Sequence, residues 1–255
     1  MKRMLAGITT LLMVGSLGYA DTLIKVPTPH DHQESQEAVN KAAAQMVDEI
    51  LRDNEFYRKA KGKEFFEAIK NGQKPRATVV SCSDSRVQMT ALDATPENDL
   101  FVIRNIGNQI SSNEGSVAYG VHHLHTPLLL IVGHTRCGAI KAAMSDYAEE
   151  SSAIRKEVDS LSLSIKKGLP TGHTHGGNED WLKGVEGNVN MQVQYALQNY
   201  AHEVKEGSLT IIGAVFDLAD DRGVGGGKLS IININGETNP KKLQANPLVK
   251  TTAGH

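Results

Sequence analysis

Two short apolar runs, each followed at once by reactive side chains, constrain the fold of this chain most. Residues 77–81 lead directly into Cys82, and residues 128–133 lead into His134 and Cys137. Short apolar runs of this kind are typical of buried strands. Because ligands bind outside the carboxyl ends of the strands in an open parallel sheet, side chains far apart in the sequence can converge at that edge.

The rest of the chain predicts the other elements of such a sheet. Strands are expected at 77–82, 99–104, 127–132, 208–217 and 228–234, and helical patterns at 112–125, 137–148, 151–166 and 178–205. Strands that alternate with helices predict an α/β fold with a central, mainly parallel β-sheet flanked by helices. The glycine-rich segment 220–227 separates the last two strands and predicts a hairpin loop.

The N-terminal region predicts export. Two basic residues, an apolar stretch from Met4 to Leu17 and a small-x-small cleavage site that ends at Ala20 are typical of a cleaved signal peptide over residues 1–20. The alternative is an uncleaved membrane anchor, but the apolar run is shorter than the roughly 20 residues that span a bilayer. We therefore expect a periplasmic or secreted protein that has no membrane contact after cleavage.

The remaining organisation follows from composition and periodicity. Residues 21–36 are expected to form a flexible lead-in, 37–240 the α/β domain and 241–255 a C-terminal tail. Apolar residues at helical spacing from Ser35 and a second pattern from Lys63 to Lys70 predict an N-terminal helical arm. The net charge is -2 and no basic patch occurs, which argues against a nucleic-acid partner.

The two cysteines allow two interpretations. In an exported protein an even pair of cysteines can form one disulfide. However, Cys82, His134 and Cys137 also form the Cys2His set of a zinc site whose fourth position is left for water or a carboxylate. A disulfide would need neither the histidine nor the charged residues beside Cys82, so the pattern favours one zinc per chain. Cobalt or cadmium could occupy the same thiolates.

The residues after Cys82 add a second functional group to this site. Asp84 and Arg86 follow at alternate positions, so an extended chain would place them on the same face as Cys82. An arginine can hold a carboxylate through a bidentate pair. A purely structural zinc site is usually closed by a fourth protein ligand, so this arrangement favours a catalytic site.

These motifs, C-x-D-x-R and H-x-x-C, resemble those of the β-class carbonic anhydrases. Other segments of the sequence occur in the family's order, namely 101–108, 114–119, 133–138 and 187–192. The resemblance implies that Asp84 and Arg86 form a dyad controlling the fourth zinc position. It implies three zinc ligands, Cys82, His134 and Cys137, and three substrate-pocket residues, Gln73, Phe101 and Tyr119.

The resemblance also implies an activity and an assembly. The expected reaction is the zinc-dependent, reversible hydration of carbon dioxide to bicarbonate and a proton, carried out by a homodimer or a higher even oligomer whose N-terminal helices pack on a partner. Two alternatives stay open. One is hydrolysis of carbon disulfide or carbonyl sulfide on the same scaffold, and the other is a non-enzymatic exported zinc-binding protein.

Other residues have simpler interpretations. His122, His123 and His125 are expected to be partly exposed helix residues, with a proton relay as the alternative. His173 and His175 lie in a glycine-rich segment that predicts a surface loop, with a second metal contact as the alternative. Trp181, the only tryptophan, lies outside the N-terminal region where regulated members of the family hold an inhibitory bicarbonate, so no such site is expected.

Overall fold

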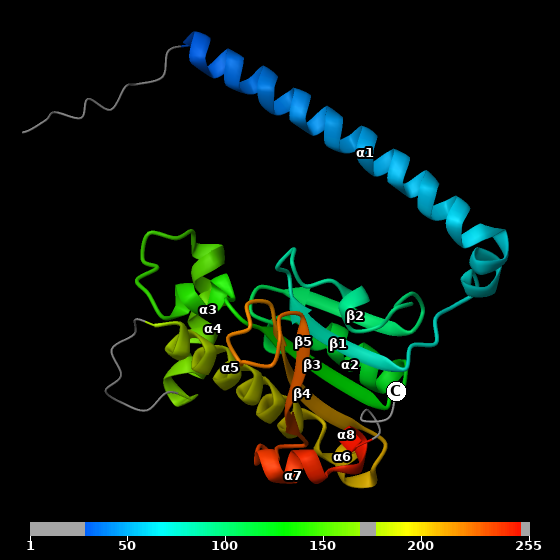
Figure 1. The fold of residues 1–255 in the computed structure, drawn as a ribbon, viewed down its shortest axis with the longest axis vertical. Helices are drawn as coiled ribbons and strands as arrows, with labels where there is room; N and C mark the ends of the chain where they lie inside the picture. The colour runs from blue at the N-terminus through cyan, green and yellow to red at the C-terminus, as the bar shows by residue number, and fades with distance from the viewer. Residues whose placement is uncertain (1–28, 169–176, 251–255) are drawn as a thin grey trace, which may run out of the picture. The chain divides into compact units, whose positions relative to one another are not determined.

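The computed structural model describes residues 29–168 and 177–250 of the chain (Figure 1). The expected signal peptide at 1–20 and the histidines His173 and His175 lie outside the described residues. The chain divides into two compact units, residues 1–68 and residues 69–255. The second unit contains the whole sheet and all of the candidate site residues.

In the first unit, the residues that the structure describes form one long helix. Helix α1 runs from Pro29 to Ile69 and is interrupted at Gly62, where φ is 74°. Glycine has no Cβ and adopts a positive φ without steric cost, so it ends one helical segment and allows the next to start at Lys63. The helical arm is therefore present in two parts, as the sequence predicts, but it begins at Pro29 rather than at Ser35.

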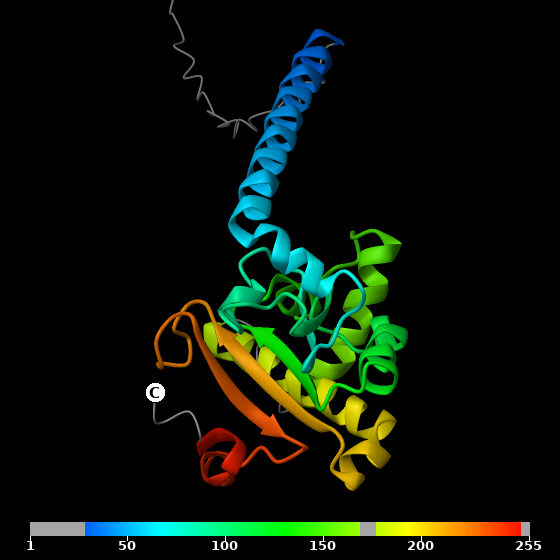
Figure 2. The same cartoon turned by 90° about the vertical axis from the view of Figure 1, so that its right-hand side faces the viewer.

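Five strands form the central sheet of the second unit. They are β1 (Ala77–Cys82), β2 (Leu100–Asn105), β3 (Leu128–His134), β4 (Thr210–Asp217) and β5 (Lys228–Ile234), arranged in the order β2-β1-β3-β4-β5. Strands β1 to β4 are parallel and β5 is antiparallel to β4. The predicted α/β fold with a mainly parallel sheet is therefore confirmed. Figure 2 shows the β4–β5 hairpin in orange.

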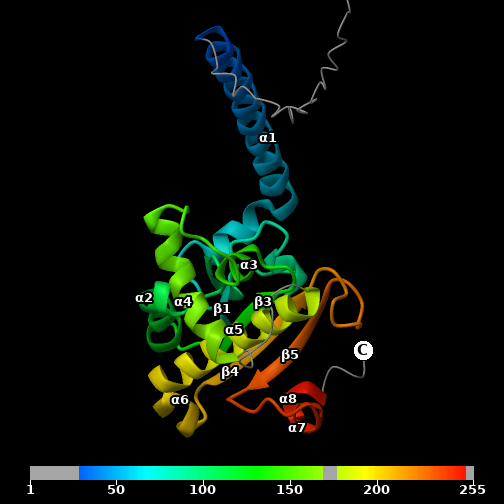
Figure 3. The ribbon, with the colours of Figure 1, turned by 90° about the vertical axis from the view of Figure 1, so that its left-hand side faces the viewer.

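Helices cover one face of this sheet. They are α2 (Glu114–Ala118), α3 (Gly138–Ala143), α4 (Ser152–Gly168), α5 (Asn178–Asn199) and α6 (Ala201–Glu206). Figure 3 shows α4 and α5 in front of the strands, and α5 contacts both β3 and β4. Glycine permits this close approach at Gly133, because a Cβ there would lie 2.6 Å from a methyl group of Val189. The end of β3 is thus packed tightly under α5.

The helix expected at 112–125 forms three short pieces instead. A 3-10 turn, η2 (Ser111–Asn113), precedes α2, and a π-helical turn, η3 (Tyr119–His123), follows it. Gly120 in η3 lies so close to β1 that a Cβ would be 2.1 Å from Oγ1 of Thr78. This approach to the sheet is a tertiary contact, which helical periodicity does not reveal. His122, His123 and His125 are exposed, as expected.

The remaining short elements lie before β2 and after β5. A 3-10 turn, η1 (Met89–Ala91), follows the end of β1. Helices α7 (Pro240–Ala245) and α8 (Pro247–Lys250) follow β5, in the region expected to be a tail. Leu243 of α7 is buried against Ile212 and Ile234 of the sheet, so packing extends beyond residue 240.

Candidate metal centre

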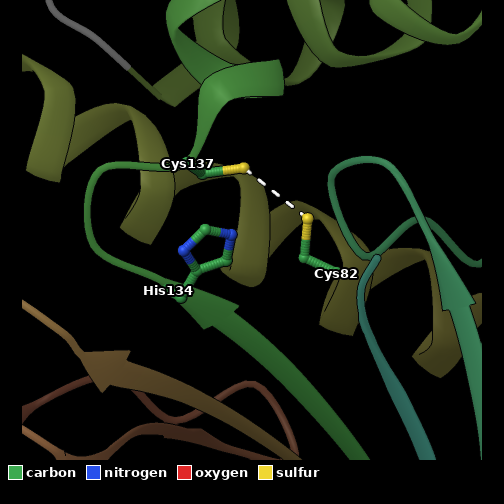
Figure 4. Close-up of side chains that lie close together, drawn as sticks. All are labelled: Cys82, His134 and Cys137. Atoms are coloured by element: carbon green, nitrogen blue, oxygen red, sulfur yellow. Dashed lines mark hydrogen bonds between the residues drawn. The ribbon is translucent and has the colours of Figure 1, made fainter. Parts of the chain in front are cut away.

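The sheet register brings the two reactive clusters together. Strands β1 and β3 are neighbours and parallel, with Ser81 opposite Val132, so Cys82 and His134 both lie at the carboxyl edge. Cys137 directly precedes α3 and has an extended backbone conformation. Figure 4 shows the three side chains, one from each strand end and one from the start of the helix, facing a common space.

The geometry of the three side chains fits a tetrahedral metal. The sulfur atoms of Cys82 and Cys137 are 4.0 Å apart, and all three ligand atoms lie within 4.8 Å of one another. Two Zn–S bonds of about 2.3 Å at a tetrahedral angle place the sulfurs about 3.8 Å apart. None of the three residues is more than 4% exposed. The cluster therefore matches a zinc site with little rearrangement.

The histidine is held in the tautomer that a metal needs. Nδ1 of His134 lies 3.0 Å from the carbonyl oxygen of Thr135. A carbonyl oxygen only accepts, so Nδ1 carries the proton and Nε2 keeps its lone pair. Nε2 is buried and has no hydrogen-bond partner among the residues that the structure describes. Buried polar atoms normally have a hydrogen-bond partner. The unpaired Nε2 of His134 is therefore available to bind a metal ion, while Nδ1 is held by its hydrogen bond.

The pairing of the two thiols shifts their pKa values in opposite directions. The hydrogen bond from Cys137 lowers the pKa of Cys82 to about 4, while the same pairing, together with burial, raises the pKa of Cys137. The first proton is therefore lost readily and the second is retained, because two adjacent buried thiolates repel one another. A divalent cation bound to both sulfurs would remove this repulsion and favour the double thiolate.

Asp84 and Arg86 form the expected pair beside this cluster. Arg86 Nε donates to Oδ1 of Asp84 at 2.8 Å and Arg86 Nη2 donates to Oδ2 at 2.6 Å. The chain turns here rather than staying extended, since the backbone N–H of Arg86 also donates to Oδ1. These bonds hold the pKa of Asp84 well below its usual range. Oδ2 lies 3.8 Å from Nε2 of His134, so an ionised carboxylate borders the metal centre.

The three predicted pocket residues are not near the metal centre of their own chain. Phe101 pairs with Thr78 in the β1–β2 register, and at about 3.3 Å per residue Thr78 lies about 13 Å from Cys82. Tyr119 packs on Phe101, with 5.8 Å between ring centroids. Gln73 is exposed and precedes the start of β1, at the edge opposite Cys82. A single chain therefore brings together the ligands and the dyad, but not this pocket.

Two residues to which the sequence gave no role also contact the site. Arg104 on β2 donates to the carbonyl oxygens of Cys82 at 3.0 Å and Asp84 at 2.7 Å, which fixes the turn that carries the dyad. Trp181 on α5 donates from Nε1 to the carbonyl oxygen of Cys137 at 2.9 Å. Arg104 lies inside a motif of the resembled family, but nothing in the sequence links Trp181 to Cys137.

A family comparison agrees with this geometry. Residues 77–224, which include every proposed ligand and both dyad residues, match the family model described as carbonic anhydrase. The chain belongs to the β-class carbonic anhydrase family. Among its relatives, the carbonic anhydrase of Mycolicibacterium smegmatis is 33% identical over 159 residues, which is 61% of this chain and 76% of that protein. Carbonic anhydrase 2 of Mycobacterium tuberculosis is 31% identical over 158 residues, 60% of this chain and 75% of that protein.

Solved structures show the same fold. The β-carbonic anhydrase CcaA superposes with a TM-score of 0.65 at 22% identity, covering 75% of this chain and 95% of that one. The β-carbonic anhydrase CafA of Aspergillus fumigatus gives a TM-score of 0.63 at 24% identity, covering 79% of this chain and 96% of that one. At these identities the likeness concerns the fold, and family membership follows from the family model and the relatives.

Proposed function

We propose that this protein catalyses the reversible hydration of carbon dioxide to bicarbonate and a proton, with one zinc ion held by Cys82, His134 and Cys137. The observation that carries the proposal is the buried Cys2His cluster beside an ionised carboxylate. Three protein ligands leave the fourth position of a tetrahedral zinc open, as catalytic sites require. When bound there, zinc lowers the pKa of a coordinated water to about 7 and so supplies a nucleophile near neutral pH.

The dyad orients this nucleophile. Asp84 is kept ionised by Arg86, so its carboxylate only accepts hydrogen bonds. Oδ2 lies 3.8 Å from Nε2 of His134, and from there it would accept the O–H of the attacking oxygen and turn a lone pair of that oxygen toward the substrate carbon. The bidentate contact with Arg86 would also keep this carboxylate from binding the zinc itself. Arg86 is thus a positioning residue and Asp84 a catalytic one.

The substrate pocket is completed by a second subunit in this proposal. Gln73 and Tyr119 are exposed, and both lie far from the metal centre of their own chain. In a homodimer or higher even oligomer, the partner subunit's Gln73, Phe101 and Tyr119 would line the space beside the zinc. Two β-carbonic anhydrases of Sordaria macrospora are tetrameric, and this chain superposes on that structure with a TM-score of 0.60. Aromatic walls suit carbon dioxide, which offers no strong hydrogen-bonding group.

Hydration of carbon dioxide by the purified protein, measured by stopped flow with a pH indicator, tests the activity. We expect activity that chelation abolishes and added zinc restores, and no activity in Cys82→Ser. A zinc-loaded protein without hydratase activity would refute the proposal. Carbon disulfide and carbonyl sulfide serve as competing substrates in the same experiment, because faster turnover of either would reassign the function.

Subunit complementation tests the shared pocket. Cys82→Ser removes the zinc site and Gln73→Ala removes a pocket residue, so each homodimer should have little activity. If the pocket crosses the interface, a mixed dimer contains one site with an intact zinc ligand set and an intact partner Gln73. Refolding the two variants together should then restore part of the activity. Mixed dimers that stay as inactive as the two variants would show that the pocket is built within one chain.

We also propose that the protein is exported after removal of residues 1–20. The support is the arrangement of basic, apolar and small residues in that segment. None of the helices that the structure describes is long and apolar enough to cross a membrane. N-terminal sequencing of the protein from its native host, fractionated by compartment, tests this proposal. A mature chain that begins at Asp21 in the periplasm or medium is expected, and an intact Met1 in the cytoplasm would refute it.

A further inference from the structure

The two residues between the ligands His134 and Cys137 are tied to the loop of the β4–β5 hairpin. Thr135 is fully buried and Arg136 is exposed. Their partners, Asp217 and Asp221, lie at the end of β4 and in the following loop. The ligand-bearing segment therefore does not hold its shape by local contacts alone.

Thr135 is fixed at both its backbone and its side chain. Its N–H donates to the carbonyl oxygen of Phe216 at 3.0 Å. Its hydroxyl donates to Oδ1 of Asp217 at 3.1 Å and accepts from the N–H of Leu218 at 2.8 Å. The Thr135 carbonyl in turn accepts from Nδ1 of His134. Fixing Thr135 therefore fixes the group that orients the His134 ring.

Asp217 is a rigid anchor for this contact. Its side chain is completely buried and accepts three backbone N–H groups of the hairpin loop, from Ala219, Asp221 and Arg222. Although burial alone would raise it, the pKa of Asp217 is lowered by these N–H groups and by the Thr135 hydroxyl. A buried carboxylate that is fully hydrogen-bonded is expensive to disturb, because any lost donor leaves charge unpaired.

Arg136 shows why an anchor is needed. Its φ is 56°, a left-handed conformation that is strained for a residue with a Cβ. Its guanidinium pairs with Asp221 at 3.0 Å, and its carbonyl oxygen accepts from Nη2 of Arg86 at 3.3 Å. Arg136 thus connects the segment 134–137, which carries two of the ligands, to the dyad. Contacts with the surrounding residues must hold Arg136 in its strained conformation.

We propose that the hydrogen bond between Thr135 and Asp217 is a positioning element that keeps His134 and Cys137 at metal-binding spacing. The inference rests on the proposed zinc site and goes beyond it, because neither residue touches the ligand atoms or the substrate. Without the bond, the segment between the ligands loses its buried anchor and the His134 ring loses its fixed hydrogen-bond acceptor. Outer-shell contacts of this kind typically change metal affinity 10- to 100-fold.

Thr135→Val tests the proposal, since valine keeps the shape of threonine and removes only the hydroxyl. Zinc affinity, measured by competition with a chromophoric chelator, should fall roughly 10- to 100-fold. The absorption bands of the cobalt-substituted protein, which report ligand geometry, should also shift. Thr135→Ser restores the hydroxyl and should return both readouts to those of the parent protein. Asp217→Ala removes the acceptor of the Thr135 hydroxyl, so adding Thr135→Val to Asp217→Ala should cause little further loss of zinc affinity.

Thr126→Val is the matched control. Thr126 is also buried, its hydroxyl contacts Thr78 at 2.8 Å and Gly120 at 3.2 Å, and it lies before the start of β3 rather than after its end. The Thr126→Val variant should destabilise the metal-free protein about as much as Thr135→Val does, but it should leave the zinc affinity unchanged. The proposal is overturned if Thr135→Val changes affinity less than about threefold, or if Thr126→Val weakens zinc as much. A parent protein that binds no zinc would instead refute the proposed function itself.

Discussion

Replacement of Asp84 by asparagine separates catalysis from metal binding. Oδ1 of Asp84 accepts from the N–H and Nε of Arg86, while Oδ2 accepts from Nη2 and faces His134. An asparagine that keeps the two bonds on its oxygen must place its NH2 where Oδ2 was. That group donates instead of accepting, so it cannot hold the O–H of the attacking oxygen, and it also opposes a guanidinium donor.

The expected losses differ for rate and for stability. An oriented catalytic contact of this kind commonly contributes on the order of a hundredfold, which is about 2.7 kcal/mol of barrier. The stability loss should stay below about 1 kcal/mol, because the side chain of Arg86 is 52% exposed and water screens the pair. Asp84→Asn should therefore retain one zinc per chain and a near-parental midpoint of unfolding, while hydration of carbon dioxide slows about a hundredfold.

Asp99→Asn is the control for this comparison. Asp99 forms the same bidentate pair with Arg76, with both N–O distances at 2.6 Å, at the opposite edge of the sheet from Cys82. It should show a similarly small change in stability and no change in rate. Stopped-flow assays, elemental analysis and thermal unfolding of the three proteins provide the data. Full activity in zinc-loaded Asp84→Asn, or loss of zinc from it, would refute the assigned role.

Three further predictions concern the thiols. Cys82→Ser and Cys137→Ser should each lose most of the zinc, and elemental analysis that finds full zinc in both would remove them from the ligand set. After zinc is removed with a chelator, the lowered pKa of Cys82 predicts one thiolate per chain at neutral pH, and this thiolate should become protonated as the pH falls through about 4. The difference in ultraviolet thiolate absorbance between the parent protein and Cys82→Ser measures this titration. Because the two sulfurs are only 4.0 Å apart, prolonged oxidation of chelated protein should convert both thiols to a disulfide. Thiol titration checks this, and zinc-loaded protein, which should keep both thiols, is the control.

Much of the fold could be predicted because its strands are short, apolar and buried. The expected limits of β1 and β5 match the structure, and those of the other strands differ by one or two residues. The prediction for β3 stopped at residue 132, yet the strand continues to His134, because Gly133 and His134 pair with Val215 and Phe216 of β4. Such pairing depends on a neighbouring strand, and local hydrophobicity does not contain it.

The helices also differ in how far the sequence alone could predict them. Regular amphipathic patterns located α4 and α5, but not the π-helical turn at Tyr119–His123, which depends on how Gly120 fits against Thr78. The tail expected after residue 240 contains α7, whose Leu243 is buried only because the sheet provides a surface for it.

The sequence by itself determined which atoms could bind a metal and which charged groups would accompany them. Two thiols, an imidazole, a carboxylate and a guanidinium appear in it at recognisable spacings, and their chemistry does not depend on the fold. Only the tertiary structure decided how these groups are held. Trp181 reaches the carbonyl of Cys137 across 44 residues, and Asp217 anchors Thr135 across 82. Contacts of this length arise when separate strands and helices pack at one edge of the sheet, so their partners are set by three-dimensional register and not by distance along the chain.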